Sequence, residues 1–211
     1  QYTADYANRM VQAGHEVVLV TTEHFPGHRY LPGVQISTPV ASRNTGFSPA
    51  GLRVWMARRA IDAVLEQKPD IVHITGPHLW NILVLRALRK AGIPTVHTLH
   101  DLDPHPGSAY GPLLYLWNRA VLRNAGHILV HGQCYRQRLL ERGLTSNCVT
   151  YTPLLHLFLG SAWMEQLNRL ADGIAYDPYV LFFGRIEPYK GVADLIAAWV
   201  RLPEALHAQA R

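Results

Sequence analysis

The sequence predicts an α/β fold with parallel β-sheets. Short apolar segments alternate along the chain with amphipathic segments of about ten to fifteen residues, the pattern of strands separated by crossover helices. Two of the helical segments are followed by glycine, Gly92 and Gly143, at the position after a helix where a left-handed backbone is common. Polar residues then follow most of the strands, as expected where the ends of parallel strands line a ligand crevice.

Hydrophobic periodicity places the elements along the chain. Helices are predicted at residues 2–13, 50–67, 79–91, 111–124, 133–142 and 161–171. Strands are predicted at residues 16–21, 34–37, 70–75, 94–99, 127–131, 147–152 and 179–183. The strand at 16–21 reads Glu-Val-Val-Leu-Val-Thr, and Trp55, Ile61 and Leu65 contribute to the apolar side of the helix at 50–67.

The composition is that of an ordinary globular enzyme domain. The chain has 211 residues, of which 48% are hydrophobic and 17% charged, so it can bury a sizeable core. Its net charge of +5 suits an anionic substrate or membrane face, and the scattered cations do not indicate nucleic acid. Two cysteines, Cys134 and Cys148, are too few for a zinc knuckle or a disulfide scaffold, which favours a reduced, cytoplasmic setting. No apolar run is long enough to span a membrane.

The polar residues after the strands are expected to gather at one edge. Strand ends occur at Thr21-Thr22, at Thr75-Gly76-Pro77-His78, at His100-Asp101, at His131-Gly132 and at Gly184-Arg185. Because the carboxyl ends of parallel strands meet at one edge of a sheet, these residues would line a single crevice. Besides His100, the residues predicted to line it are Thr75, Gly76, His78, Asp101 and His131.

The segment from Leu181 to Gly191 carries the clearest chemical signal. An apolar run stops at Gly184, and two cations follow, Arg185 and Lys190. Glycine lets the backbone approach a ligand closely, the guanidinium offers a planar fork of donors to phosphate oxygens, and the lysine adds a point charge. Gly191 then opens a helix whose free N–H groups favour an anion. Together these residues predict a grip for a diphosphate.

The same residues resemble a known family. Phe-Phe-Gly-Arg-Ile-Glu-Pro-Tyr-Lys-Gly, at 182–191, is similar to the donor-binding segment of retaining GT-B glycosyltransferases of glycosyltransferase family 4. Three further segments resemble that family in the same order: Ala-Gly-His-Glu-Val at 13–17, Pro-Asp-Ile-Val-His-Ile at 69–74 and Thr-Leu-His-Asp at 98–101. The resemblance implies two Rossmann-like domains and the transfer of a sugar, with retention, from a nucleotide-diphosphate donor to an acceptor hydroxyl.

The resemblance also implies the domain limits. Residues 1–152 would form the acceptor-side domain without its first strand, 153–178 the connection, and 179–211 the start of the nucleotide-sugar domain. The family's glycine-rich loop would precede Gln1 and its carboxylate pair would follow Arg211, so the chain alone is expected to be inactive. Two alternatives stay open: a catalytically silent Rossmann-like module that binds a phosphorylated ligand or a protein, and a GT-B epimerase or phosphorylase.

His100 is the candidate residue nearest the sugar. It ends an apolar strand, so its imidazole is expected to project into the crevice, where it can hydrogen-bond a sugar hydroxyl or stabilise developing charge. The resemblance places a histidine of this segment near the donor sugar and gives Arg185 and Lys190 the diphosphate. His97 lies three residues earlier, on the opposite face of the strand, and is expected to pack under a helix.

A metal centre is the competing interpretation of this histidine-rich region. His97, His100, Asp101, Asp103 and His105 are close in sequence, but their spacing separates His97 from His100 across the strand and differs from the metallohydrolase pattern. We therefore expect no metal and no cofactor. The partners expected are a nucleotide sugar and a glycan or lipid-linked acceptor.

The helix at 111–124 has two possible roles. It mixes large apolar residues with Trp117, Arg119 and Arg123, which fits a core helix with a charged outer face. The same residues could instead touch an anionic lipid surface, which would suit a lipid-linked acceptor at the inner face of a plasma membrane. The sequence alone leaves both open.

Overall fold

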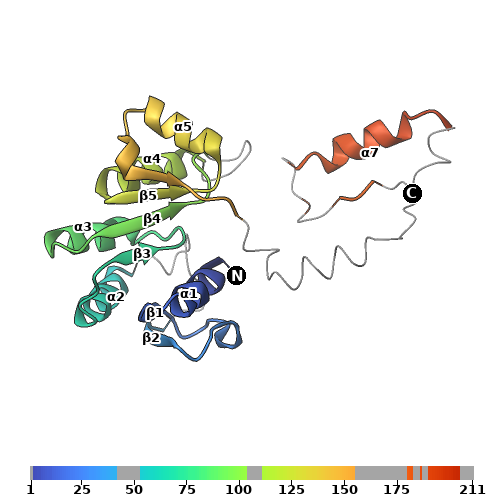
Figure 1. Ribbon diagram of the computed structural model, residues 1–211. Helices are drawn as coiled ribbons and strands as arrows, with labels where there is room; N and C mark the ends of the chain where they lie inside the picture. Colours follow the sequence, from blue (N-terminus) through green and yellow to red (C-terminus); the bar gives the residue numbers. More distant parts are fainter. Residues whose placement is uncertain are drawn as a thin grey trace. The chain divides into compact units, whose positions relative to one another are not determined.

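The structure is a computed structural model that describes residues 2–41, 53–103, 111–154, 180–182, 186 and 190–204 (Figure 1). Residues 2–41, 53–102 and 112–154 belong to one compact unit, and the described residues from 180 onward belong to a second. The predicted domain limits at 152 and 178 stay a prediction because residues 155–179 are outside the described chain.

The described elements follow the predicted order. The helices are α1 (Tyr2–Gln12), α2 (Val54–Glu66), α3 (Asn81–Lys90), α4 (Gly111–Asn124), α5 (Gln133–Glu141) and α7 (Val192–Val200), with single 3-10 turns η1 (Gly27–Arg29) and η3 (Ser146–Cys148). The strands are β1 (Val17–Thr22), β2 (Val34–Val40), β3 (Val72–Ile74), β4 (Thr95–Leu99), β5 (His127–Val130) and β6 (Val149–Tyr151). The α/β class with parallel strands is confirmed. The helix predicted at 161–171 lies outside the described residues.

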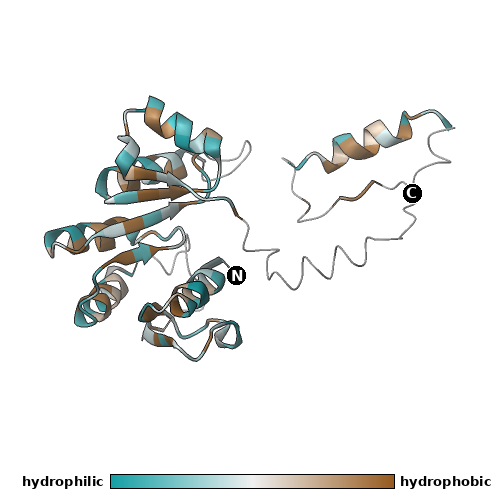
Figure 2. Cartoon of the chain, in the orientation of Figure 1, coloured by the Kyte–Doolittle hydropathy of each residue, from teal (hydrophilic) through white to brown (hydrophobic). Residues whose placement is uncertain are grey.

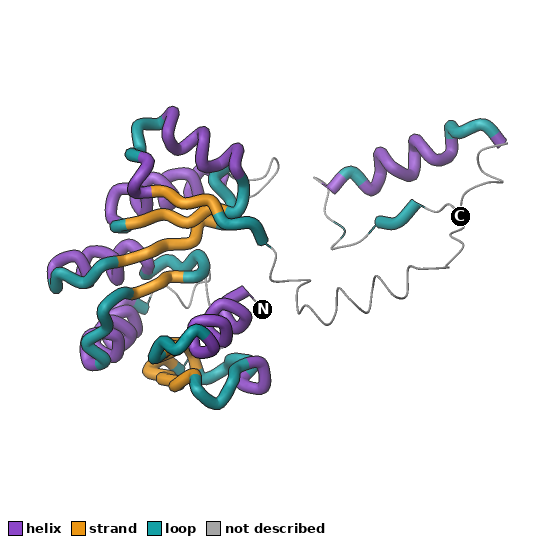
Figure 3. The backbone as a smooth tube through the Cα atoms, in the orientation of Figure 1, coloured by secondary structure: helices purple, strands orange, loops and turns teal. Residues whose placement is uncertain are grey.

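The described strands form two sheets (Figure 3), and every strand pair in them is parallel. One contains β1 and β2, and the other runs β3-β4-β5-β6. The expectation that all the strand ends line one edge is therefore wrong for Thr21 and Thr22, because β1 is not hydrogen-bonded to the four-stranded sheet. The ends of β3, β4 and β5 do lie side by side, as strand neighbours must.

Helix α1 is attached to both sheets. Toward its start, the Thr3 hydroxyl is 2.8 Å from the hydroxyl of Thr75, just after β3. Toward its end, the Asn8 side chain donates to the Arg29 carbonyl oxygen and accepts from the Leu31 N–H, each at 2.8 Å. A side chain at Gly33 would place a Cβ 2.6 Å from Val11, so α1 lies against the turn that leads into β2. The helix thus fastens the β1–β2 pair beside the larger sheet.

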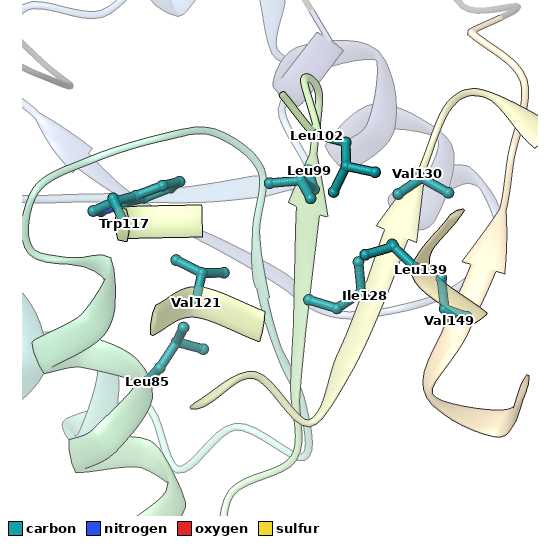
Figure 4. Packing of buried hydrophobic residues seen from close by; sticks show 9 residues of the cluster. All are labelled: Leu85, Leu99, Leu102, Trp117, Val121, Ile128, Val130, Leu139 and Val149. Carbon is teal, nitrogen blue, oxygen red and sulfur yellow. The ribbon is translucent and has the colours of Figure 1, made fainter. Parts of the chain in front are cut away.

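The two faces of the four-stranded sheet differ. Since side chains alternate along a strand, His97 and Leu99 of β4 share one face with Ile128 and Val130, their partners in β5. That face is the main core, where the strands meet residues of α3, α4 and α5 (Figure 4). Its buried residues are Leu85, Leu99, Leu102, Trp117, Val121, Ile128, Val130, Leu139 and Val149. The opposite face, with His73 and Thr98, receives α1.

Most described elements differ from their predicted limits by a few residues, and two of the differences, both in strands, have a physical reason. Strand β2 continues to Val40 where the sequence predicts an end at 37, and it contains Pro39. A proline is tolerated there because β2 pairs with no other strand than β1 among the described residues, so its other edge needs no ladder hydrogen bond. The strand predicted at 179–183 is not formed at Val180–Phe182. A strand needs a hydrogen-bonded neighbour, and the described part of the second unit contributes only the helix α7.

Helix α7 consists mostly of apolar residues (Figure 2), and its Ile196 and Val200 side chains are exposed. Within the described residues, no helix is both long and apolar enough to cross a membrane.

Candidate functional site

The residues that follow β3, β4 and β5 meet at one end of the four-stranded sheet. The His100 ring donates from Nε2 to the carbonyl oxygen of Thr75 at 2.8 Å, which joins the ends of β4 and β3. The His131 ring donates from Nδ1 to the carbonyl oxygen of Thr152 at 2.9 Å, which joins the end of β5 to the residue after β6. The two imidazoles lie 5.2 Å apart between ring centroids. The structure thus brings His100, His131 and Thr75 together at this end of the sheet, and their role as the lining of a ligand crevice stays a prediction.

Tyr2, in the first turn of α1, closes this group of side chains. Its ring meets His100 edge to face at 5.2 Å and His131 at 5.0 Å. Its hydroxyl lies 3.1 Å from the hydroxyl of Thr98, which is buried on the α1 face of β4. Burial raises the pKa of the Tyr2 hydroxyl. We call Tyr2, His100 and His131 the histidine cluster.

His73, in β3, supports the cluster from within the sheet. Its Nε2 lies 2.8 Å from the Thr98 hydroxyl, and its ring meets Tyr6 edge to face at 4.5 Å. Burial, with smaller contributions from the charges of His100 and His131, lowers the pKa of His73 to about 4. His73 is therefore neutral near neutral pH, so the side chain that packs beneath the cluster carries no charge.

The other residues predicted to line the crevice, Gly76, Asp101 and His78, are held by hydrogen bonds to residues of α3, α4 and the start of α3. The Gly76 carbonyl oxygen accepts from the side chain of Asn81 at 2.8 Å, and the Asp101 carbonyl oxygen accepts from Asn118 at 3.1 Å. His78 accepts at Nδ1 from the N–H of Trp80, 3.1 Å away, so its ring is used at the start of α3 and not in the cluster. These contacts fix the backbone of the loops that follow β3 and β4.

His97 is buried on the opposite face of β4 from the cluster, as predicted. It has no exposed surface, its ring lies 5.7 Å from that of Trp117, and its Nε2 is 2.9 Å from the Asn81 side chain. Burial, with a smaller contribution from His73, lowers its pKa to about 4. Among the described residues, which exclude His105, no three histidine, cysteine or acidic side chains are grouped as metal ligands.

The predicted diphosphate grip is described only in part. Lys190 is exposed and is separated from the start of α7 by Gly191. Gly191 is the N-cap of that helix and has φ 69°, a left-handed conformation that favours glycine. Gly184 and Arg185 lie outside the described residues. These four assignments stay predictions.

Sequence reasoning missed the residues that approach the cluster from other elements. Tyr2 and Tyr6 are four apart on α1, so they share a helix face, and their ring centroids are 6.2 Å apart. That spacing could have marked the pair as one surface. Nothing local in the sequence indicates that Thr98 or Asn81 would be hydrogen-bonded to them or to the loops.

Comparisons with known proteins give the family. Residues 1–154 match the family model of the glycosyl transferase 4-like domain. The chain is 28% identical to a GDP-mannose-dependent alpha-mannosyltransferase of Mycobacterium tuberculosis, over 87% of this chain and 51% of that protein. It is 25% identical to a sulfoquinovosyl transferase of Arabidopsis thaliana, over 97% of this chain and 43% of that protein. The chain therefore spans about half the length of these relatives.

A solved structure agrees in fold. Anabaena HepE, crystallised in complex with UDP and glucose, superposes with a TM-score of 0.56 at 17% identity, over 98% of this chain and 55% of that one. The resemblance of the four sequence segments, the parallel α/β sheets and the family match all agree. The chain belongs to the glycosyl transferase 4-like family, and its architecture is that of the GT-B glycosyltransferases.

Proposed function

We propose that this chain is part of a glycosyltransferase that moves a sugar, with retention, from a nucleotide-diphosphate donor to an acceptor hydroxyl in glycolipid or polysaccharide assembly. The observation that carries the proposal is the position of His100. Its ring stands at the end of β4, between the Thr75 carbonyl and Tyr2, in a chain whose first 154 residues match the family model.

The main requirement of the proposed sugar transfer is stabilisation of the leaving group, the nucleoside diphosphate. As the bond between the sugar and the diphosphate breaks, negative charge accumulates on the diphosphate oxygens. Arg185 and Lys190 would neutralise that charge without a metal, and His100 would hydrogen-bond the sugar while the anomeric carbon becomes electron-poor. Gly184 and Gly191 would let the backbone approach the phosphates closely.

The names of the relatives suggest which donors to try. One relative is named as GDP-mannose-dependent, and the solved structure contains UDP and glucose. GDP-mannose and UDP-glucose are therefore the first donors to offer, with a lipid-linked glycan as acceptor. The anomeric configuration of the product, compared with that of the donor by NMR, tests retention.

Turnover should depend on His100. In the full-length protein, His100→Ala is expected to lower kcat about tenfold or more, because it removes a hydrogen bond to the reacting sugar, while the affinity for the free nucleoside diphosphate stays nearly unchanged. Transfer of a radiolabelled sugar and calorimetric binding of the nucleotide measure the two effects. His28→Ala, at an exposed histidine in η1, is the matched control.

The same assay separates the competing functions. Binding of nucleotide sugar without turnover in the unmodified protein would favour the silent binding module. Loss of transfer in a chelator, restored by zinc, would favour a metal centre and contradict the proposed role of His100.

We also propose a peripheral position on an anionic membrane, with the start of α4 as the contact. Leu113, Tyr115 and Leu116 are exposed there, Leu116 by 62%, and Arg119 and Arg123 are exposed further along the helix. Trp117, which the sequence offered as a lipid contact, is not part of this surface, because it is only 5% exposed and belongs to the main core. The exposed apolar residues would enter the interface while the arginines face the lipid phosphates.

Membrane binding is expected to be reversible and sensitive to salt. Each basic residue near an anionic leaflet contributes about 1 kcal/mol, so Arg119→Glu with Arg123→Glu should abolish most pelleting with anionic liposomes at low ionic strength. Arg89→Glu with Lys90→Glu, at the exposed end of α3, is the matched charge control. No pelleting of the unmodified protein at low salt, or pelleting that salt does not reverse, would contradict this part of the proposal.

A further inference from the structure

The loop between β3 and α3 is held by two consecutive carbonyl oxygens. The Thr75 oxygen accepts from His100 Nε2, and the Gly76 oxygen accepts from Asn81 Nδ2, both at 2.8 Å. The two donors come from different elements, the end of β4 and the first residue of α3. The position of the Thr75 oxygen, and with it the orientation of the His100 ring, therefore depends on how firmly Asn81 holds the next peptide.

Asn81 is itself oriented by its two partners. Its side chain is 5% exposed, and its Nδ2 lies 2.8 Å from the Gly76 oxygen and 2.9 Å from His97 Nε2. A carbonyl oxygen only accepts, so Gly76 requires that the amide nitrogen, and not the amide oxygen, face this way. The second amide hydrogen then points at His97 Nε2, which has to be the acceptor.

The tautomer of His97 follows from this geometry. An imidazole that accepts at Nε2 is neutral and carries its proton on Nδ1. The hydrogen bond between the Asn81 amide and His97 Nε2 is therefore the contact that selects this form of the ring. A proton added at Nε2 would face the Asn81 amide hydrogen. The repulsion between the two hydrogens would break the hydrogen bond between Asn81 and the Gly76 carbonyl oxygen.

The tautomer of His100 follows from the other carbonyl. The Thr75 carbonyl oxygen can only accept, so His100 carries its proton on Nε2 and leaves a lone pair on Nδ1 when the ring is neutral. His100 is half-buried, and its Nδ1 makes no hydrogen bond with the described residues. A ligand hydroxyl can donate to that nitrogen.

We propose that Asn81 and His97 are positioning residues, which act on His100 through the backbone of Thr75 and Gly76. They hold the His100 ring with its proton on Nε2, so that its Nδ1 is free of that proton and can accept a hydrogen bond from a hydroxyl of the ligand. The ligand half of this inference rests on the proposed function. The positioning half concerns the protein alone and is measurable without turnover. In this arrangement a deoxy sugar that lacks the hydroxyl facing His100 loses one hydrogen bond in the transition state.

The direct test is the tautomeric state of each histidine in the chain labelled with 15N-histidine. Two-bond 1H–15N spectra at mildly alkaline pH distinguish the two tautomers, and His97→Gln and His100→Gln identify the two signals by their loss. His97 is expected to show the less common form with the proton on Nδ1, in roughly tenfold or greater excess, since a single hydrogen bond decides between the forms. His100 is expected to show the Nε2 form. The opposite tautomer at either histidine in the unmodified chain would overturn the proposal.

Variants then test the connection between the pair and His100. Asn81→Asp keeps the shape but replaces the donor by a carboxylate, so His97 should change to the Nε2-protonated form and the His100 signal should shift or broaden. His97→Gln supplies an amide oxygen as a new acceptor for Asn81, so the His100 signal should stay as in the unmodified chain, whereas His97→Leu should change it. An unchanged His100 signal in both Asn81→Asp and His97→Leu would overturn the connection.

Measurements of kcat and of nucleotide affinity distinguish a positioning role of His97 from a role in folding alone. In the full-length protein, His97→Leu is expected to lower kcat several-fold with little change in nucleotide affinity, and His97→Gln is expected to restore it. A loss of nucleotide affinity equal to the loss of kcat would identify a structural defect and overturn the positioning role. If no donor is turned over by any form of the protein, the proposed function fails while the tautomer measurements still decide the positioning half.

Discussion

Replacing Arg185 or Lys190 with alanine in the full-length protein is expected to lower kcat/KM roughly ten- to a hundredfold, because a charge-assisted hydrogen bond contributes about 1.5–3 kcal/mol. The effect should fall mainly on kcat, since in the proposed reaction the charge on the diphosphate grows as the sugar leaves. Lys190 stands directly before Gly191, the N-cap of α7, so its cation and the helix N-terminus would act on the same anion.

Sugar-transfer kinetics with the best donor measure this effect. Arg201→Ala, at the exposed end of α7, removes a cation at the far end of the same helix and should leave kcat/KM within about twofold, as expected for a cation that does not touch the substrate. If Arg185→Ala and Lys190→Ala both stay within the range of that control, the diphosphate grip is wrongly placed.

Acid is expected to unfold the chain through its buried histidines. The pKa values of His73 and His97 are both lowered to about 4 by burial, from an ordinary value of 6.5. Between pH 6.5 and pH 4 the unfolded chain binds protons that the folded chain does not. The contribution of the two neutral histidines to the free energy of unfolding is therefore fully present above pH 6.5 and is lost as the pH falls toward 4. Each pKa unit corresponds to about 1.4 kcal/mol, so each histidine should remove roughly 2–3 kcal/mol over this range.

Urea unfolding followed by circular dichroism from pH 7 to pH 4 measures the loss. His73→Gln and His97→Gln should each flatten the dependence on pH, and His28→Gln, at an exposed histidine, should leave it unchanged. A free energy of unfolding that stays constant between pH 6.5 and pH 4.5 would show that the two histidines are protonated in the folded protein.

The order of elements could be predicted because it depends on local patterns. The apolar run at 16–21 and the glycine at Gly92 identify a strand and a helix end from neighbouring residues alone, and β1 and α3 lie where these signals place them. The pairing of the strands is not local, because it depends on which edges meet after the chain has folded. The separation of β1 and β2 from the other sheet was therefore missed.

The candidate site was predictable to the same extent. An odd spacing in a strand separates His97 from His100, and the structure puts them on opposite faces. Tyr2 and Asn81 could not be assigned, because Tyr2 contacts Thr98, 96 positions away, and Asn81 joins the nearby Gly76 carbonyl to His97, 16 positions away. Sequence identified the strand ends that carry the site, and tertiary contacts determine how each ring is held there.

Helix α1 connects the candidate site mechanically to the small sheet. Its first turn carries Tyr2 against His100 and His131, and its Asn8 is hydrogen-bonded on both sides of the turn that precedes β2. An α-helix is stiff along its axis because every turn is braced by hydrogen bonds. Because the two ends of this one stiff element are held by the histidine cluster and by the segment Arg29–Leu31, a change in the orientation of the β1–β2 pair is expected to move Tyr2 relative to His100 and His131.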